Sequence, residues 1–415
     1  MKIFKLMAIA LVAMVGFSSC DKNCDHDFIE YDYSEALVGT WTYVADNGLA
    51  EAMIINPDGS FNVTGVMKGG SLYEEKGTIK VVNNKVSLVF EGDGDVTEGR
   101  LELVAGKSLS IVLNEESDIR LTYDYCENDL SDEIVGMWVC NDLSNGVESN
   151  IAINTYKEDG TMNFTGVIPN AEEYMVNITT NYKVVGNLLF TQRADLLATS
   201  GVDKYVSARL DYAPNGTAFG DIMIFKQNII QGDGEIENTS TYLRVKQNLN
   251  LTGKKYAYKS AYISNAKGTN EDFSMMGSTF NMANIEGSNF DDIFGDDLYS
   301  VELNANSIVH KFRPNGHEVE VVTPITVNGN KVTLDMSTVN PACRTVEMYM
   351  FQDVDDSQLH IYMPTQSFIN YFANLELPDL IAEGKNDAAA IEKFYTDMEA
   401  RIESINVNFV FKARK

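Results

Sequence analysis

Short runs of alternating apolar and polar residues dominate the first third of the chain. KVSLVF at 85–90 and RLELV at 100–104 show the alternation plainly, and such runs are rich in β-branched and aromatic residues. Glycine and asparagine interrupt the runs about every 8–12 residues, a spacing typical of an antiparallel meander closed into a barrel or folded into a sandwich. Eight strands are predicted, near residues 39–45, 51–57, 60–66, 73–82, 85–91, 98–105, 108–113 and 118–125.

The chain then repeats this scheme. LVGTW at 37–41 and IVGMW at 134–138 open two copies, and NPDGSFNVTGV at 56–66 matches KEDGTMNFTGV at 157–167. LTGKKY at 251–256 opens a third, weaker copy. Self-similarity at a period of about a hundred residues predicts duplicated domains and not a solenoid of short repeats.

The third copy differs from the others by two insertions. The first, 265–297, is rich in Asn, Gly and Asp. The second, 364–405, holds apolar residues at helical spacing, so we expect a helix capped by Asn386 and a shorter helix over 365–375. The apolar faces of these helices must be buried, and a mouth or flank of the third domain is the expected place.

Composition and charge narrow the class of partner. The formal net charge is −28, and a field of this sign repels nucleic acid and anionic lipid head groups. We therefore expect no nucleic-acid partner. An acidic surface also keeps an exported protein dispersed, and a hydrophobic content of 44% is sufficient for folded cores.

The N-terminal residues, MKIFKLMAIALVAMVGFSSC, predict an exported protein. Lys2 and Lys5 precede an apolar run, 6–17, that is too short to cross a hydrocarbon core of about 30 Å, and small residues follow it. Residues 1–19 therefore read as a signal peptide. The ending resembles the lipobox of bacterial lipoproteins, which implies that Cys20 carries palmitate-like acyl chains and anchors the protein in outer-membrane lipid. A chance cysteine after an ordinary signal, or a spanning anchor, is the alternative.

Four further cysteines follow Cys20, namely Cys24, Cys126, Cys140 and Cys343. An exported location permits disulfides, and four cysteines allow three pairings, among which the sequence does not choose. Bridges between residues 126 and 140 or between residues 24 and 126 are both open. No CxxC pair occurs, which argues against zinc or thiol redox chemistry.

A Gly-x-Trp at the start of a copy, with an arginine in its last strand, is similar to the lipocalin pattern. The residues are Gly39, Trp41 and Arg120 in the first copy and Gly136, Trp138 and Arg244 in the second. In the third copy Tyr256 and Lys412 stand at these places. The chain resembles the lipocalin-like domains of Gram-negative envelope lipoproteins. This resemblance implies closed eight-stranded barrels in which each guanidinium lies over an indole face as a structural pair.

Catalytic motifs are missing from the sequence, which has no GxSxG elbow, HExxH or P-loop. His310 and His317 flank one turn, but a metal site there would need carboxylates as well. The acidic loops at 91–95, 291–297 and 353–357 do not fit the EF-hand spacing. We therefore predict no enzyme, no cofactor and no metal centre.

These observations predict an all-β cell-envelope lipoprotein, on the periplasmic face or the cell surface of the outer membrane. Its expected function is to bind a small apolar ligand, with the third barrel favoured for its helices and Met-rich insertion. The alternative is a surface interaction or adhesion module with solid barrels that docks a protein or glycan. The predicted segments are a signal peptide 1–19, a lipidated tether 20–35, and lipocalin-like domains 36–127, 131–247 and 249–415, the last with insertions 265–297 and 364–405.

Overall fold

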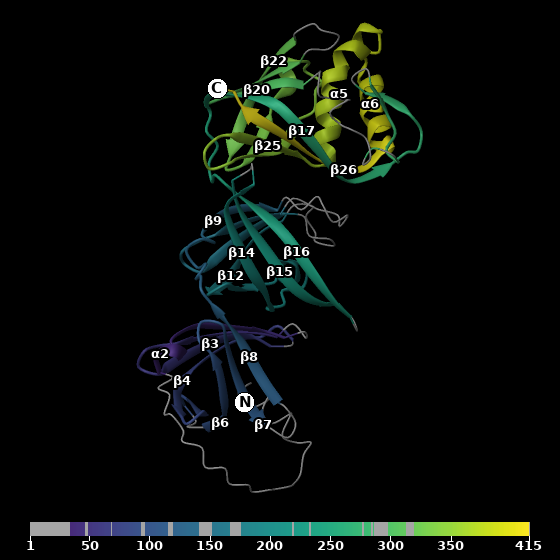
Figure 1. The fold of residues 1–415 in the computed structure, drawn as a ribbon. Helices are drawn as coiled ribbons and strands as arrows, with labels where there is room; N and C mark the ends of the chain where they lie inside the picture. The colour runs from purple at the N-terminus through teal and green to yellow at the C-terminus, as the bar shows by residue number, and fades with distance from the viewer. Residues whose placement is uncertain are drawn as a thin grey trace.

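The computed structural model shows a mostly β protein with three closed barrels of eight antiparallel strands each, which confirms the predicted fold class. The barrels follow one another from the N-terminal end to the C-terminal end of the molecule (Figure 1). The residues that the structure describes are 34–45, 49–67, 69–92, 96–114, 119–140, 152–166, 176–217, 220–231, 234–275, 278–283, 285, 298–312 and 319–414.

Several predicted features lie outside these residues. They include the signal peptide, the acylation site Cys20, Cys24 and His317. Within the described residues, no helix is both long enough and apolar enough to cross a membrane.

Barrel one closes by pairing its first strand with its eighth. Its strands are β1 Gly39–Val44, β2 Ala50–Ile55, β3 Ser60–Val66, β4 Leu72–Val82, β5 Lys85–Phe90, β6 Val96–Val104, β7 Ser108–Asn114 and β8 Ile119–Cys126. A short helix, α2 Ser34–Leu37, precedes them.

Barrel two has the same order of strands, with its first strand, β9, closing the ring between the second and the eighth. Its strands are β9 Gly136–Cys140, β10 Ala152–Tyr156, β11 Thr161–Gly166, β12 Val176–Val185, β13 Leu188–Gln192, β14 Tyr205–Thr217, β15 Gly220–Gln231 and β16 Gly234–Val245. Helix α3, Ala194–Ser200, connects β13 to β14.

Barrel three interrupts the meander with the two predicted insertions. Its barrel strands are β17 Thr252–Gly268, β20 Leu298–Asn304, β21 Ser307–Phe312, β22 Val319–Asn328, β23 Lys331–Leu334, β24 Val346–Gln352, β25 Gln358–Met363 and β26 Ile402–Ala413. The first insertion holds the hairpin β18 Phe273–Met275 and β19 Ser278–Phe280. Helices α5 Thr365–Ala382 and α6 Ala388–Arg401 form the second, and a 3₁₀ turn, η3, spans Met336–Thr338.

The helices differ from the sequence prediction in two details. Helix α5 runs on to Ala382, past the predicted end at residue 375, and contains Pro378. The N-cap of α6 is Asp387 and not Asn386, because the Asp387 carboxylate accepts a 2.8 Å hydrogen bond from the backbone N–H of Ala390.

The repeated opening motif closes one end of barrels one and two. The indole N–H of Trp41 donates to the carbonyl of Leu37 at 2.8 Å, and that of Trp138 donates to Ile134 at 2.6 Å. Both indoles are fully buried, so this bond satisfies a polar group that would otherwise be stranded in the core. Gly39 has a φ of +139°, and a Cβ there would lie 2.7 Å from the Tyr125 ring.

Apolar clusters join each barrel to the next. Between barrels one and two the cluster contains Ala50, Ala52, Val66, Val185, Leu188 and Phe190. Between barrels two and three it contains Val139, Ile153, Leu243, Val245, Tyr349, Phe351 and Tyr362. These side chains sit on outward faces of their barrels, so the alternation of buried and exposed residues breaks down where two barrels meet.

Polar contacts add to the second of these junctions. Lys246 Nζ forms a 2.7 Å ion pair with Asp356, and the backbone N–H of Asn250 donates to Gln352 Oε1 at 2.5 Å. The chain that links the two barrels is therefore bonded to barrel three along its length, which favours a fixed orientation between them.

The core of barrel one contains a buried carboxyl group among apolar side chains. Glu51 is 4% exposed, and the hydroxyls of Tyr73 and Tyr123 donate to its two oxygens. The Tyr73 ring reaches across Gly65, where a Cβ would lie 2.4 Å from the ring. Burial raises the pKa of Glu51; the two tyrosine hydrogen bonds oppose that effect, and the nearby charge of Glu75 adds to it.

We predict that Glu51→Gln stabilises barrel one at neutral pH. Since the pKa of Glu51 lies above its usual 4.5, its stabilising contribution is fully present below pH 4.5 and is lost as the pH rises through the folded value. Calorimetry should show the variant melting roughly 5 °C or more above the wild type at pH 7, with the two converging near pH 4.

Glu98→Gln, on an exposed position of β6, is the matched control and should leave the melting temperature unchanged. A Glu51→Gln variant that melts below the wild type at pH 7 would show that the ionised carboxylate stabilises the barrel instead.

Candidate binding cavity in the second barrel

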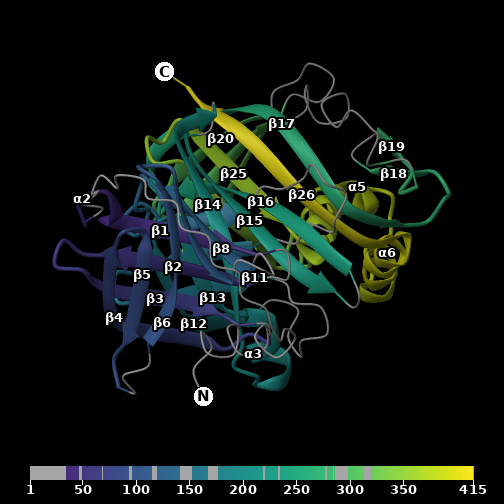
Figure 2. The same cartoon turned by 60° about the horizontal axis from the view of Figure 1, so that its bottom comes forward.

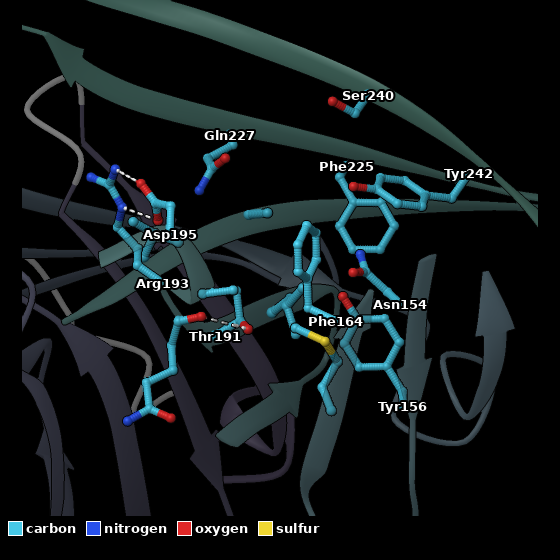
Figure 3. A pocket seen from close by; sticks show the side chains of 16 residues that line it. Asn154, Tyr156, Phe164, Thr191, Arg193, Asp195, Phe225, Gln227, Ser240 and Tyr242 are labelled. Carbon is cyan, nitrogen blue, oxygen red and sulfur yellow. Dashed lines mark hydrogen bonds and ion pairs between the residues drawn. The ribbon is translucent and has the colours of Figure 1, made fainter. Parts of the chain in front are cut away.

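Barrel two contains an open cavity of about 360 Å³ (Figure 3). This volume lies within the range of about 300–1,000 Å³ found for small-molecule sites, at its lower end. The described residues that line it are Asn154, Tyr156, Met162, Phe164, Leu189, Thr191, Gln192, Arg193, Ala194, Asp195, Val206, Ala208, Phe225, Gln227, Ser240 and Tyr242.

One end of this barrel is closed by a packed cluster. Trp138 is fully buried there together with Ile134, Leu210 and Met223. The hydrogen bond from the Trp138 indole to Ile134 holds the preceding turn over the barrel end. The cavity therefore opens only away from this cluster, as far as the described residues show.

Toward the other end the inward side chains become small or polar. On β14 these are Val206 and Ala208, which lie opposite Thr191 and Leu189 of β13, and Ser240 lines the cavity from β16. These side chains leave the open end of the barrel unfilled. At the closed end, larger side chains fill the corresponding space. The volume of the cavity thus follows from residue size along two neighbouring strands.

Aromatic rings form one wall of the cavity. The rings of Tyr156 and Phe225 are nearly parallel, with centroids 6.4 Å apart, and those of Phe225 and Tyr242 lie 4.5 Å apart. Tyr182 stands edge-on to Tyr156 at 4.8 Å, behind this wall. Figure 3 shows Phe164 also projecting toward the same space. Mutual packing restricts these rings, so the wall is preformed for a flat apolar partner.

Asn154 is the one buried amide in this aromatic wall among the described residues that line the cavity. It is 6% exposed and lies opposite Trp138 on β9 and Phe164 on β11, so its side chain faces the interior. Its Oδ1 has no hydrogen-bond partner among the described residues. A buried acceptor left unpaired costs about 1–3 kcal/mol, which a bound donor would recover.

The tyrosines beside Asn154 remain neutral phenols. Burial raises the pKa of Tyr156 and of Tyr242 well above the ordinary range, and side-chain hydrogen bonds with Asn154 oppose that rise in both. Asn154 therefore lies beside neutral phenols, and its Oδ1 is a buried acceptor without a hydrogen-bond partner among the described residues.

The rim of the cavity carries a closed ion pair. Arg193 Nε and a terminal guanidinium nitrogen lie 3.0 and 2.5 Å from the Asp195 oxygens, a two-point contact at the start of α3. Burial would raise the pKa of Asp195, but the hydrogen bond and charge of Arg193 outweigh it and leave the pKa lowered. Among the described residues that line the cavity, these two charges cancel each other.

Among the site residues predicted from sequence, the structure brings Trp138 and Arg244 together. They are direct partners on β9 and β16, and Arg244 Cζ lies 5.3 Å from the Trp138 ring centroid. Arg244 also donates to the carbonyl of Val135 at 2.7 Å and lies 3.6 Å from Asp221. The pair covers the closed end of barrel two and lies outside the cavity lining.

The equivalent place in barrel one is taken by a tyrosine. Tyr125 is the partner of Trp41 across β8 and β1, with ring centroids 5.1 Å apart in an edge-on arrangement. Arg120 lies earlier on β8 and forms a 2.6 Å ion pair with Glu102 at the surface. The short motif therefore describes the second barrel more closely than the first.

Barrel three, the favoured pocket in the sequence analysis, has its interior occupied by protein. Phe368, Ile369 and Phe372 of α5 belong to one buried cluster with residues of the barrel strands. Deeper in, the Tyr371 hydroxyl lies 3.1 Å from His310 Nδ1, and burial lowers the pKa of His310 to about 4. Among the described residues, α5 thus occupies space beside the strands where the sequence analysis favoured a pocket, and the cavity described above lies in barrel two.

The surroundings of α5 explain this filling. Every residue from 367 to 374 is buried, because α5 lies between β24–β26 and α6. The β18–β19 hairpin lies beside the same helices (Figure 2), with Phe273 in the shared cluster and the Arg401 guanidinium 5.8 Å from its ring. A helical segment buried on all sides, as 367–374 is, carries no single apolar stripe.

The cysteines within the described residues, Cys126, Cys140 and Cys343, are not bridged to one another, so the bridge between residues 126 and 140 that the sequence left open is not formed. Burial raises the pKa of Cys126 and of Cys343, which makes both poor nucleophiles.

Sequence reasoning did not find the cavity residues. Asn154 stands in AINTY at 152–156, where the alternation places it on the same face as Tyr156. An amide at an inward position of an otherwise apolar strand is the signal that could have marked it.

Comparisons with known proteins add a distant likeness. No protein-family model matches this chain, and no curated protein matches it. Among solved structures it is similar to a double mutant of the vaccine antigen transferrin binding protein B from Haemophilus parasuis Hp5, at 8% identity and a TM-score of 0.24. The match covers 88% of this chain and 66% of that one, so the chain spans just under two thirds of that protein's length. A TM-score this low supports no functional argument.

Proposed function

We propose that this protein is a non-catalytic cell-envelope lipoprotein with three lipocalin-like domains, over 36–127, 131–247 and 249–415. Acyl chains on Cys20 anchor it in the outer membrane. The barrels act as a rigid stack that presents the third barrel to a protein or glycan partner. The observation that carries this proposal is the filling of barrels one and three by side chains, together with the apolar clusters that join neighbouring barrels.

Several features suit such a stack for display. With the anchor at the N-terminus, barrel three is the most distant of the three along the molecule (Figure 1). Its solid interior provides a firm support for α6, the outermost helix, which packs on α5. Arg344 fastens α6 with ion pairs to Glu392 and Glu399 at 3.0 and 2.7 Å, and its guanidinium lies 4.2 Å from the Tyr395 ring.

The exposed face of α6 is the surface to test. Lys393 and Asp397 form a 2.7 Å ion pair there, with Thr396 beside them. Because α5 is part of the core, deleting 364–405 would unfold barrel three, so surface substitutions on α6 are the cleaner test.

We predict that Lys393→Asp, Asp397→Lys and Thr396→Arg together weaken partner binding at least about tenfold without unfolding barrel three. Swapping the two charges keeps the intrahelical pair, worth about 0.2–0.5 kcal/mol, while the surface presented to a partner changes. Binding to a glycan array and to a panel of extracellular proteins, followed by titration of each hit, is the measurement.

The control exchanges the charges of Lys226 and Asp211, an exposed ion pair of 2.6 Å on barrel two. Loss of binding in this control, with binding retained in the α6 variant, would place the docking surface elsewhere and contradict the proposal.

Anchoring has its own test. We predict that labelled palmitate enters the wild-type protein in its native host and that Cys20→Ala abolishes this incorporation, while Cys24→Ala retains it. Equal labelling of the wild type and Cys20→Ala would remove the anchor from the proposal and leave the barrels' arrangement untouched.

A second candidate function, binding of a small ligand, is favoured by the cavity of barrel two. Its support is the volume of about 360 Å³, the preformed aromatic wall and the unpaired Oδ1 of the buried Asn154. The two functions are compatible, because the cavity and α6 belong to different barrels.

We predict that Val206→Trp, which places a large ring inside the cavity, abolishes uptake of small aromatic compounds. Native mass spectrometry and thermal shift with an apolar compound panel provide the measurement. Val104→Trp, at a position of barrel one that is 54% exposed, is the matched control and should bind as the wild type does. Equal uptake by wild type and Val206→Trp would mean that the compounds bind elsewhere.

A further inference from the structure

We infer that the cavity of barrel two selects an uncharged compound of one or two flat rings that carries one hydroxyl or N–H donor, as phenols and indoles do. This inference rests on the second candidate function above and names the class of its ligand. Four features of the lining lead to it.

The volume limits the size of the ligand. A cavity of about 360 Å³ is near the lower end of small-molecule sites, so one or two rings fit and a long acyl chain or a four-ring compound does not. The closed end, sealed by Trp138 and Ile134, prevents a longer ligand from passing through the barrel.

The wall favours a flat ring over a branched aliphatic group. Phe225 packs between Tyr156 and Tyr242, at centroid distances of 6.4 and 4.5 Å. Aromatic pairs prefer centroid separations of about 4.5–7 Å in offset or edge-on arrangements, so a further ring can extend this array without rearranging it. Met162, also in the lining, supplies a polarisable sulfur that suits contact with a ring.

The one unpaired buried acceptor among the described lining residues sets the polarity of the ligand. Asn154 is more than nine-tenths buried, and its Oδ1 has no partner among the described residues. Burial raises the pKa of the neighbouring Tyr156 and Tyr242, so both stay neutral phenols beside this acceptor. A ligand hydroxyl or N–H would therefore donate to Oδ1, and a ligand that offers only acceptors would leave it unpaired.

The charges of the lining exclude an ionised ligand. Among the described lining residues, Arg193 and Asp195 are the charged ones, and they are bound to each other at 2.5 and 3.0 Å. Neither is free to neutralise a ligand charge, and an unpaired charge is costly to bury. A carboxylate or ammonium compound of the same shape is therefore rejected.

The test uses 2-naphthol, its methyl ether 2-methoxynaphthalene, and 2-naphthoate, each titrated calorimetrically into the full chain. The key quantity is the ratio of the dissociation constant of the ether to that of naphthol. We expect this ratio to fall about two- to tenfold in Asn154→Leu relative to the wild type, because the variant lacks the acceptor for the naphthol hydroxyl. Comparing the ratio between the two proteins cancels the greater hydrophobicity of the methyl ether. Naphthoate should bind at least about tenfold more weakly than naphthol to the wild type.

Thr155→Val is the matched control, since Thr155 is the next residue on β10 and its side chain points to the opposite face of the strand. It should keep the wild-type ratio. An unchanged ratio in Asn154→Leu, or naphthoate binding as tightly as naphthol, would overturn the ligand class while leaving the cavity a binding site. If none of these compounds and no member of the apolar panel binds, the second candidate function itself fails.

Discussion

Closing eight strands into a ring creates an interior that side chains must fill, because voids in a protein forfeit dispersion contacts on every surface that lines them. The three barrels of this chain meet that requirement differently. Barrel one is packed with its own side chains and a buried Glu51, and barrel three takes in helix α5. Barrel two has a sealed end and a hollow end. The order of strands around each ring is nearly the same, so the filling is what separates a supporting barrel from a candidate binding barrel.

A second consequence of closure is that the outer faces become the contact surfaces between domains. A closed barrel has no edge strand to pair with a neighbour, so barrels can join only through side chains on their outer faces. Here they do so through small and aromatic residues, such as Ala52 beside Leu188 and Phe190, and Ile153 near Phe351. Interfaces between domains are often polar and mobile, whereas these are apolar and backed by hydrogen bonds such as that from Asn250 to Gln352. The stack is therefore better suited to hold a distal barrel at a fixed place than to open and close.

Much of the fold was predictable because its signals are local. The alternation in β5 places Val86, Leu88 and Phe90 on one face, and the structure buries all three, while the residues between them are half-buried. Residue type also predicts the turns. Asn83 and Asn84 have φ values of +47° and +63°, as a tight hairpin between strands requires. The two helices of the last insertion were recognisable, although α5 proved longer than its predicted range and Asp387 took the capping role expected of Asn386. End positions of helices depend on which nearby side chain reaches the free N–H groups, and adjacent Asn and Asp offer equal chemistry.

The sequence by itself determined the strands, the repeat, the absence of familiar catalytic motifs and the N-terminal pattern of an exported protein, since each depends on residues close together in the chain. Only the tertiary structure decided which barrel is hollow. That property depends on the combined volume of inward side chains from eight strands, and in barrel three on a helix that arrives from outside the ring. It also decided the meaning of single residues: Asn154 is an ordinary polar residue in its strand until Trp138, Phe164 and Tyr242 surround it. The packing of an interior depends on side-chain volumes from segments that are far apart in the chain, and a local sequence pattern does not contain that information.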